Sequence, residues 1–216
     1  MRPILTIVIA SRNKGKKVEI QELLNDFPVN IKTLDDFGPV PEIAENGTTF
    51  EENAYQKASS IARILGLPAL ADDSGLVVEV LDGRPGVYSA RYAGEDATDR
   101  QRCLKLLEEM EGQANRSAVF ECVVSIAVPS GSALTYEGKC EGLIAQTTSG
   151  SGGFGYDPVF FYPPAGKTFA EMTAEEKNSV SHRGKALRDL CAEFEKALIW
   201  IRQHMPLPEP GNCKGD

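Results

Sequence analysis

Two adjacent carboxylates stand between two apolar runs in the first half of the chain. Residues 69–71 are Ala-Leu-Ala, residues 72–75 are Asp-Asp-Ser-Gly, and a second apolar run begins at Leu76. A carboxylate buried between apolar segments must find a partner or shift its pKa. A hard cation such as Mg²⁺ is one suitable partner, because it prefers oxygen ligands. Asp-Ser-Gly is also good β-turn chemistry, so this segment alone indicates either an acidic metal site or a polar turn.

The composition limits the class of protein. The chain has 216 residues, of which 42% are hydrophobic and 25% are charged, which suits one large α/β domain or two lobes that share a core. The net charge of −8 argues against a general nucleic-acid binder, whose domain is usually basic. Local lysines or a bridging metal can still bind a polyphosphate. We therefore expect a small-molecule partner and no nucleic acid.

Cysteine usage and the N-terminal apolar run bear on location. The chain has five cysteines, an odd number, and none of them forms a C-x-x-C pair. This pattern favours reduced thiols in the cytoplasm over a disulfide framework or a zinc site. The apolar run at residues 4–10 is too short to span a membrane, and no small-residue cleavage signature follows it. We interpret it as a buried first strand and expect no membrane partner.

Strands and helices alternate in the first half of the chain. The expected elements are strands at 4–10 and 29–34 and helices at 15–26 and 49–65. The first strand is predicted from its β-branched residues. The helix at 15–26 is expected to bury Val18, Leu23 and Leu24. Thr49 and Glu52 form a capping box, which predicts where the second helix begins.

The second half predicts a further set of elements. These are a helix capped by Thr98, antiparallel strands at 119–128 and 134–147, a short strand at 159–162, a short helix capped by Thr173, and a last helix from Ser181 to about Gln203. The helix after Thr98 is expected to bury Leu104, Leu107 and Met110. The pattern indicates an α/β fold with a mixed, elongated sheet flanked by helices and two lobes with an active-site cleft between them. Residues 1–204 would form one domain and residues 205–216 a Pro/Gly-rich tail.

A basic loop follows the first predicted strand. Residues 11–17 read Ser-Arg-Asn-Lys-Gly-Lys-Lys and precede a predicted helix. A helix N-terminus carries free N–H groups and partial positive charge, so it is suited to phosphate. The segment is not a P-loop, since it lacks the upstream glycine and the following Ser or Thr. The alternative is a solvated basic turn. The candidate phosphate ligands are Ser11, Arg12, Asn13, Lys14, Gly15 and Lys16.

An acidic loop and the helix after it add three candidates. Asn53 and Lys57 are four residues apart, so they share one helix face. Lys57 could contact a phosphate and Glu45 a metal. Taken alone, these side chains are more typical of a solvated face.

A glycine-rich loop at residues 150–158 contains aromatic side chains. Its literal G-x-G-x-x-G match is not the dinucleotide fingerprint, because that motif must follow a strand and open a helix. Phe154 and Tyr156 stand among glycines, where a flat ligand can approach both backbone and ring, as in base stacking. The alternative is an ordinary glycine loop anchored by its aromatics.

Three basic side chains lie near the start of the last predicted helix. His182 is one of two histidines, and an isolated histidine is usually structural or solvated. Together with Lys177 and Arg183 at a helix N-terminus, it becomes a candidate donor to an electron-rich ligand. A nucleoside triphosphate with Mg²⁺ would use all four regions: lysines for phosphate, carboxylates for the metal, and aromatic and donor groups for the base.

The same motifs, in the same order, resemble the Ham1/RdgB family of inosine/xanthosine triphosphate pyrophosphatases. The matching segments are Ser-x-Asn-x-Gly-Lys at 11–16, Thr-Phe-Glu-Glu-Asn-Ala at 49–54, Ala-Asp-Asp-Ser-Gly-Leu at 71–76, Pro-Gly-Val-Tyr-Ser-Ala-Arg-Tyr-Ala-Gly at 85–94, Gly-Gly-Phe-Gly-Tyr-Asp-Pro at 152–158 and Glu-Lys-Asn-Ser-Val-Ser-His-Arg-Gly at 176–184. The resemblance covers roughly residues 4–200. It implies hydrolysis of ITP, dITP and XTP to monophosphate and pyrophosphate, with water attacking the α-phosphorus, Mg²⁺ assisting, and a homodimer.

The resemblance also implies roles for individual residues. Asp73 would be the proton acceptor and a metal ligand, with Glu45 as a second metal carboxylate. Residues 11–16 and Lys57 would hold phosphates, and Ser74 would contact substrate. Phe154 would stack on the base. The rest of the base pocket would be Gly155, Tyr156, Asp157 and, as donors near the 6-oxo group, Lys177, His182 and Arg183.

Departures from the family pattern are few. Arg12 stands where small residues are common, and only Glu45 remains of an acidic pair that often precedes the Asn-Gly. No residue visibly rejects the 2-amino group of guanine. The alternatives are a Maf-type nucleotide pyrophosphatase, which the Phe-Gly-Tyr-Asp and Ser-His-Arg motifs disfavour, and a non-catalytic nucleotide-binding regulator, which Lys16, Asp73 and Ser74 disfavour.

Overall fold

The first three strands form the parallel part of one seven-stranded sheet. The computed structural model describes residues 4–205. In it β1 (Leu5–Ile9) pairs in parallel with β2 (Val29–Thr33) on one side and with β3 (Ala69–Val78) on the other. The predicted first strand, rich in β-branched residues, is thus confirmed, and it lies buried between two neighbours.

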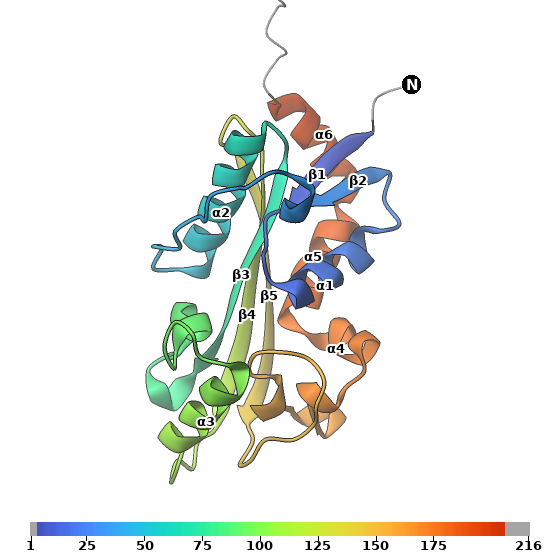
Figure 1. Cartoon of the computed structure of the whole chain (residues 1–216). Helices are drawn as coiled ribbons and strands as arrows, with labels where there is room; N and C mark the ends of the chain where they lie inside the picture. Colours follow the sequence, from blue (N-terminus) through green and yellow to red (C-terminus); the bar gives the residue numbers. More distant parts are fainter. Residues whose placement is uncertain (1–3, 206–216) are drawn as a thin grey trace, which may run out of the picture.

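The remaining strands extend the sheet with antiparallel pairing. The sheet order is β2-β1-β3-β4-β5-β6-β7, where β4 is Ser117–Ala127, β5 is Ala133–Ile144, β6 is Phe160–Tyr162 and β7 is Lys167–Thr168. The long strands β3, β4 and β5 run the length of the molecule (Figure 1). The predicted mixed, elongated sheet is therefore confirmed.

Helices cover both faces of this sheet (Figure 1). They are α1 (Lys14–Leu24), α2 (Phe50–Leu65), α3 (Asp99–Glu109), α4 (Ala174–Val180), α5 (His182–Ala192) and α6 (Phe194–His204). α2 packs against β3 and β4, whereas α5 packs against β4 and β5 from the other face. The predicted capping box at Thr49 and Glu52 opens α2, and the αL residue Gly66 ends it, as is typical of helix C-termini.

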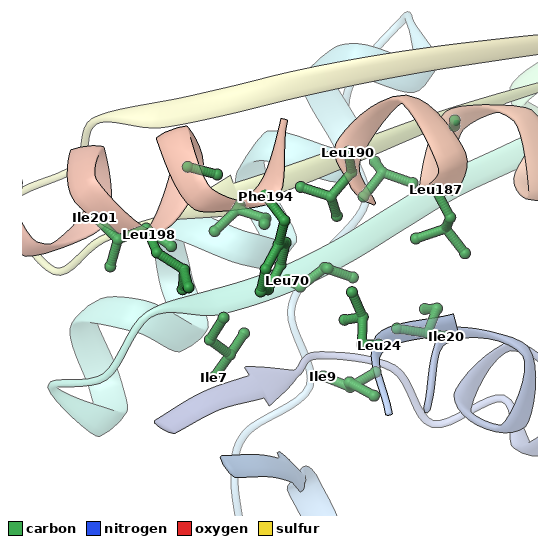
Figure 2. Close-up of a cluster of buried hydrophobic side chains, with 14 of the residues drawn as sticks. Ile7, Ile9, Ile20, Leu24, Leu70, Leu187, Leu190, Phe194, Leu198 and Ile201 are labelled. Atoms are coloured by element: carbon green, nitrogen blue, oxygen red, sulfur yellow. The ribbon is translucent and has the colours of Figure 1, made fainter. Parts of the chain in front are cut away.

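Apolar side chains form three main clusters around the sheet. Figure 2 shows the first, in which Ile7, Ile9 and Leu70 of the strands meet Leu190 and Phe194 of the C-terminal helices. A second cluster gathers α3 with β3 to β6, and a third places small side chains of α2 against β1 and β3. Burial of this apolar surface is the main favourable term in folding, and it fixes the strands that carry the site.

The structure corrects four details of the sequence prediction. The turn alternative for residues 72–74 is wrong, since β3 continues through them. The last predicted helix divides at Glu193 (φ −110°, ψ 11°) into α5 and α6, and the break keeps the apolar faces of both helices in one cluster. Val18 and Leu104, expected in the core, are 51% and 50% exposed. Packing against the sheet sets the rotation of these short helices, and it turns other apolar residues inward.

Candidate active site

A pocket of about 330 Å³ lies between β1 and β3, where the strand order reverses. The chain passes from β1 to β2 on one side of it, and then to β3 on the other side. β1 pairs with β3 only through Ala69 and Leu70, so within residues 4–205 the β1-facing edge of β3 has no strand partner beyond that point. The chain leaves β1 into α1 on one face of the sheet and leaves β2 toward α2 on the other (Figure 1). Such a switch point leaves space between the diverging connections, which is where open α/β sheets bind ligands.

Most of the residues predicted for the site line this pocket. They are Ser11, Arg12, Asn13, Lys16, Glu45, Lys57, Asp73, Ser74, Phe154, Gly155, Tyr156, Asp157, Lys177, His182 and Arg183. Lys14 and Gly15 are not among the lining residues. Lys14 is exposed. A Cβ on Gly15 would lie 2.8 Å from the Phe154 ring carbons, so Gly15 lets that ring approach the α1 N-terminus.

The N-terminus of α1 forms the basic side of the pocket. Asn13 is the N-cap residue, and its side chain accepts a hydrogen bond from the Lys16 N–H at 3.1 Å. The Lys16 Nζ lies 2.9 Å from Asp72 Oδ2. Arg12 donates to the Val40 carbonyl at 2.8 Å, which ties this loop to the acidic loop that contains Glu45. Helix N–H groups and a lysine thus meet at one place, as anion binding requires.

Asp72 is the centre of an ion network on the α5 side of β3. Its Oδ2 accepts hydrogen bonds from Arg183 Nε at 3.1 Å and pairs with Lys16. Burial raises the pKa of Asp72, but the charges of Lys16, Arg183 and Lys57 outweigh it and hold that pKa well below its usual range. Asp72 is therefore ionised at neutral pH. Its buried Oδ1 has no hydrogen-bond partner within residues 4–205.

Asp73 points to the opposite face of β3, as alternation along a strand requires. Its two oxygens accept hydrogen bonds from Asn53 Nδ2 at 3.1 Å and from Lys57 Nζ at 3.2 Å. Burial is the largest influence and raises the pKa of Asp73 above its usual value, despite the nearby charge of Lys57. For Lys57, burial opposes the charge, but Asp73, Asp72 and Glu45 together raise its pKa. Asp73 thus takes up a proton more readily than an ordinary aspartate.

The carboxylates near Lys57 fit the needs of a magnesium site. The Lys57 Nζ lies 3.4 Å from Glu45 Oε1 and 3.2 Å from Asp73 Oδ1, so one amine holds both side chains near each other. Among the described residues no group of three or more His, Cys, Asp or Glu side chains is arranged to hold a metal. Mg²⁺ does not need such a cage, because it commonly binds one or two carboxylates together with substrate phosphates and water.

The aromatic loop forms the other end of the pocket. Phe154 lies between Gly153 and Gly155, whose φ values of 71° and 64° are left-handed. Lys177 Nζ lies 4.4 Å above the centre of the Phe154 ring and 2.7 Å from Asp157 Oδ2. A 3₁₀ turn and then β6 follow this loop. The prediction that the G-x-G-x-x-G match is not a dinucleotide fingerprint is therefore confirmed, because no α-helix begins there.

Arg183 and His182 are more deeply buried than their sequence context suggested. Arg183 pairs with Asp72 and donates to Ser74 Oγ at 2.9 Å. The His182 ring stacks on Phe120 with centroids 4.6 Å apart. Burial, aided by neighbouring cations such as Arg183, lowers the pKa of His182 well below its usual value. The ring is therefore neutral at pH 7, so any hydrogen bond that His182 donates is without charge, and its buried Nδ1 has no protein partner within residues 4–205.

Sequence reasoning missed three charged residues at this site. Glu19 lies one turn after Lys16 on α1, and its two oxygens contact Arg183 at 2.5 Å and Lys177 at 3.3 Å. Asp99 and Arg102, in the first turn of α3, line the pocket. The spacing of Lys16 and Glu19 at i and i+3 was a signal for a shared helix face, but only the fold shows which cations that face meets.

The mixed α/β fold and a pocket lined by a helix N-terminus, carboxylates and an aromatic loop fit an enzyme that hydrolyses a nucleotide, and the comparisons with known proteins agree. The chain belongs to the Ham1 family, whose model matches residues 7–193. It is 60% identical over 195 residues to the dITP/XTP pyrophosphatase of Syntrophobacter fumaroxidans (strain DSM 10017 / MPOB), covering 90% of this chain and 84% of that protein. The predicted family resemblance is thereby confirmed.

Two further comparisons agree with this placement. The dITP/XTP pyrophosphatase of Desulfotalea psychrophila (strain LSv54 / DSM 12343) is 55% identical over 204 residues, which is 94% of this chain and 92% of that protein. The solved structure of a HAM1 protein from Coxiella burnetii superposes with a TM-score of 0.84 at 45% identity, covering 89% of this chain and all (100%) of that chain.

Proposed function

We propose that the protein hydrolyses dITP and XTP, and with them ITP, to the nucleoside monophosphate and pyrophosphate. The observation that carries this proposal is the 60% identity to a dITP/XTP pyrophosphatase over 90% of the chain. The arrangement of the pocket supports it, because hydrogen-bond donors suited to phosphate at the N-terminus of α1, paired carboxylates on β3 and an aromatic loop all line one space. Removing such nucleotides would keep the cellular pool free of non-canonical purines.

In this proposal the phosphates bind at residues 11–16 and at Lys57. Asp73 accepts the proton of the water that attacks the α-phosphorus, a role that its raised pKa supports because an efficient base has a pKa close to the working pH. Asp73 and Glu45 would hold Mg²⁺, which when bound neutralises charge on the phosphate oxygens. Asp72, held ionised by Lys16 and Arg183, keeps those cations in position.

The base would stack on Phe154 at the other end of the pocket. A 6-oxo purine accepts a hydrogen bond where adenine donates one, so a nearby Lys177 ammonium favours hypoxanthine and xanthine over adenine. Lys177 is held over the Phe154 ring and against Asp157, which supports this assignment. The neutral His182 ring would act as a donor or acceptor without charge.

A panel of nucleotides tests the proposal directly. The purified protein with Mg²⁺ is expected to release pyrophosphate from ITP, dITP and XTP, and little from GTP, ATP or dTTP. Orthophosphate as the first product would contradict attack at the α-phosphorus. Preference for dTTP or UTP would favour a Maf-type activity, and tight binding without turnover would favour a regulator.

The assembly and location are also proposals. We infer a homodimer from the family resemblance alone, and sedimentation equilibrium of the purified protein tests it. Four free cysteines among residues 4–205, Cys103, Cys122, Cys140 and Cys191, support a reducing compartment such as the cytoplasm. No helix within the described part of the chain is long and apolar enough to cross a membrane.

A further inference from the structure

The loop that carries Phe154 has few contacts of its own to fix the aromatic ring. Both neighbours of Phe154 are glycines with positive φ, and neither has a side chain that could pack. Within the loop, the Phe154 N–H donates to Asp157 Oδ2 at 2.8 Å. Lys177 lies over the ring and Gly15 lies against it, and the position of the ring also depends on contacts that other elements make to the loop backbone.

The first two turns of α3 supply two of these contacts. Asp99 Oδ2 accepts a hydrogen bond from the Gly155 N–H at 2.7 Å, and the Cys103 thiol donates to the Gly155 carbonyl oxygen at 3.3 Å. Asp99 and Cys103 are four residues apart, so they lie on one face of the helix. One helix face thus binds both backbone polar groups of the residue that follows Phe154.

The same helix is tied to a second loop at the rim of the pocket. Asp99 also pairs with Arg102, and Arg102 donates to the carbonyl oxygens of Ala90 at 2.8 Å and Ala97 at 2.5 Å. The Tyr156 hydroxyl donates to the Ser89 carbonyl at 2.9 Å. The 89–97 segment and the aromatic loop are therefore held together as one unit.

The thiol contact is suited to a lasting structural role. Cys103 is buried, and burial, with the nearby charges of Asp99 and Asp157, raises the pKa of its thiol to about 12. The sulfur consequently keeps its proton at neutral pH and remains a donor to the Gly155 carbonyl. A thiolate would be repelled by that oxygen.

We propose that Asp99 and Cys103 are positioning residues that fix the Phe154 ring, and so set the affinity for the purine and not for the phosphates. The inference rests on the proposed function, in which the base stacks on Phe154. The phosphate end is built from other elements, the N-terminus of α1 and Lys57 of α2. Loss of the contacts that Asp99 and Cys103 make to Gly155 should therefore leave phosphate binding intact.

Calorimetry with two probes separates the two ends of the pocket. We would titrate the full-length protein, in EDTA to prevent turnover, with ITP and with inorganic tripolyphosphate, and take the ratio of the two affinities as the nucleoside preference. Asp99→Ala leaves the Gly155 N–H without its charged acceptor, so this preference should fall about tenfold. Tripolyphosphate should bind at least as tightly as before, since a negative charge has been removed. Asp96→Ala removes an exposed carboxylate just before α3 and should leave the preference unchanged.

Two further variants test whether the effect passes through the ring. In a Phe154→Ala background, Asp99→Ala should cause no further loss of nucleoside preference, because there is no ring left to position. Cys103→Ser, which keeps a donor, should retain the preference, and Cys103→Val should lower it. Circular dichroism melts check that each variant is folded.

The outcomes distinguish the inference from the function on which it rests. Three results would overturn the positioning role alone. Asp99→Ala could keep the wild-type nucleoside preference, or it could lose affinity equally for ITP and for tripolyphosphate. The third result is that Asp99→Ala lowers the nucleoside preference as much in the Phe154→Ala background as in the wild type. A wild-type protein that binds ITP no more tightly than tripolyphosphate would overturn the base site itself, and the positioning role with it.

Discussion

The two faces of β3 treat neighbouring aspartates in opposite ways. On one face, Asp72 meets the cations Lys16 and Arg183, and its pKa is held well below the usual range. On the other face, Asp73 meets the amide of Asn53 and a single ammonium, that of Lys57, and its pKa is raised by burial. The two carboxylates differ in sequence position by one residue, yet the strand directs them into separate environments.

This difference indicates that the two aspartates have different roles, one structural and one catalytic. A carboxylate that is locked in ion pairs is a poor proton acceptor, because its charged form is already stabilised. A partly desolvated carboxylate with a raised pKa accepts a proton more easily. The Asp72 face is therefore suited to hold cations in place, and the Asp73 face is suited to catalysis.

The largest expected effect is on turnover, from the Asp73 face. Asp73→Asn removes the proposed proton acceptor while keeping shape and the contact to Lys57, so kcat for ITP should fall about 10²- to 10⁴-fold. Because a buried carboxylate of raised pKa disfavours the charged native state, the variant should be at least as stable as the wild type at pH 7. Wild-type kcat in a folded Asp73→Asn protein would remove Asp73 from the chemistry.

The matched change on the other face should act on stability. Asp72→Asn leaves buried Arg183 with Glu19 as its remaining carboxylate and leaves the half-buried Lys16 without Asp72. Breaking a buried pair of this kind costs up to about 3–5 kcal/mol. The measurement is the free energy of unfolding in urea at pH 7. A loss below about 1 kcal/mol, the size expected of an exposed pair, would show that Asp72 is not a structural centre.

The pH dependence of stability should differ in sign between these variants. The folded pKa of Asp72 lies below its unfolded value, so its stabilising contribution is present above about pH 4 and is lost as the pH falls further. The folded pKa of Asp73 lies above its unfolded value, so its carboxylate begins to cost stability as the pH rises past the unfolded pKa, and the cost is complete above the raised folded pKa. Acidification should therefore shrink both the deficit of Asp72→Asn and the advantage of Asp73→Asn. Differences that do not depend on pH would refute the assigned shifts.

A smaller effect is expected from the lysine on the Asp73 face. Lys57→Met removes a cation that favours the ionised form of Asp73, so the acid limb of the kcat/KM profile should move to higher pH. Lys16→Met is the comparison on the other face, and it should weaken binding without moving that limb as far. An equal shift of the acid limb in the two variants would mean that Lys57 and Lys16 act equally on the pKa of Asp73, and that the two faces do not differ in electrostatics.

Local signals in the sequence predicted much of the fold. The capping box at Thr49 needs only residues within one turn, and the αL residue Gly66 ends the same helix, so both ends of α2 could be read directly. The paired environment of Asp72 could not, because Arg183 lies 111 residues further along the chain. Glu19 and Asp99 were missed for the same reason: each acts through partners that only the tertiary structure brings near.

A ¹³C NMR titration of the two carboxyl groups tests the central comparison most directly. The side-chain resonances of Asp72 and Asp73, assigned with the Asp→Asn variants, would be followed as the folded protein is acidified. We predict that Asp73 titrates above the usual value of aspartate, while Asp72 stays ionised down to the onset of acid unfolding. A titration of Asp72 at higher pH than Asp73 would contradict the division of labour between the two faces of β3.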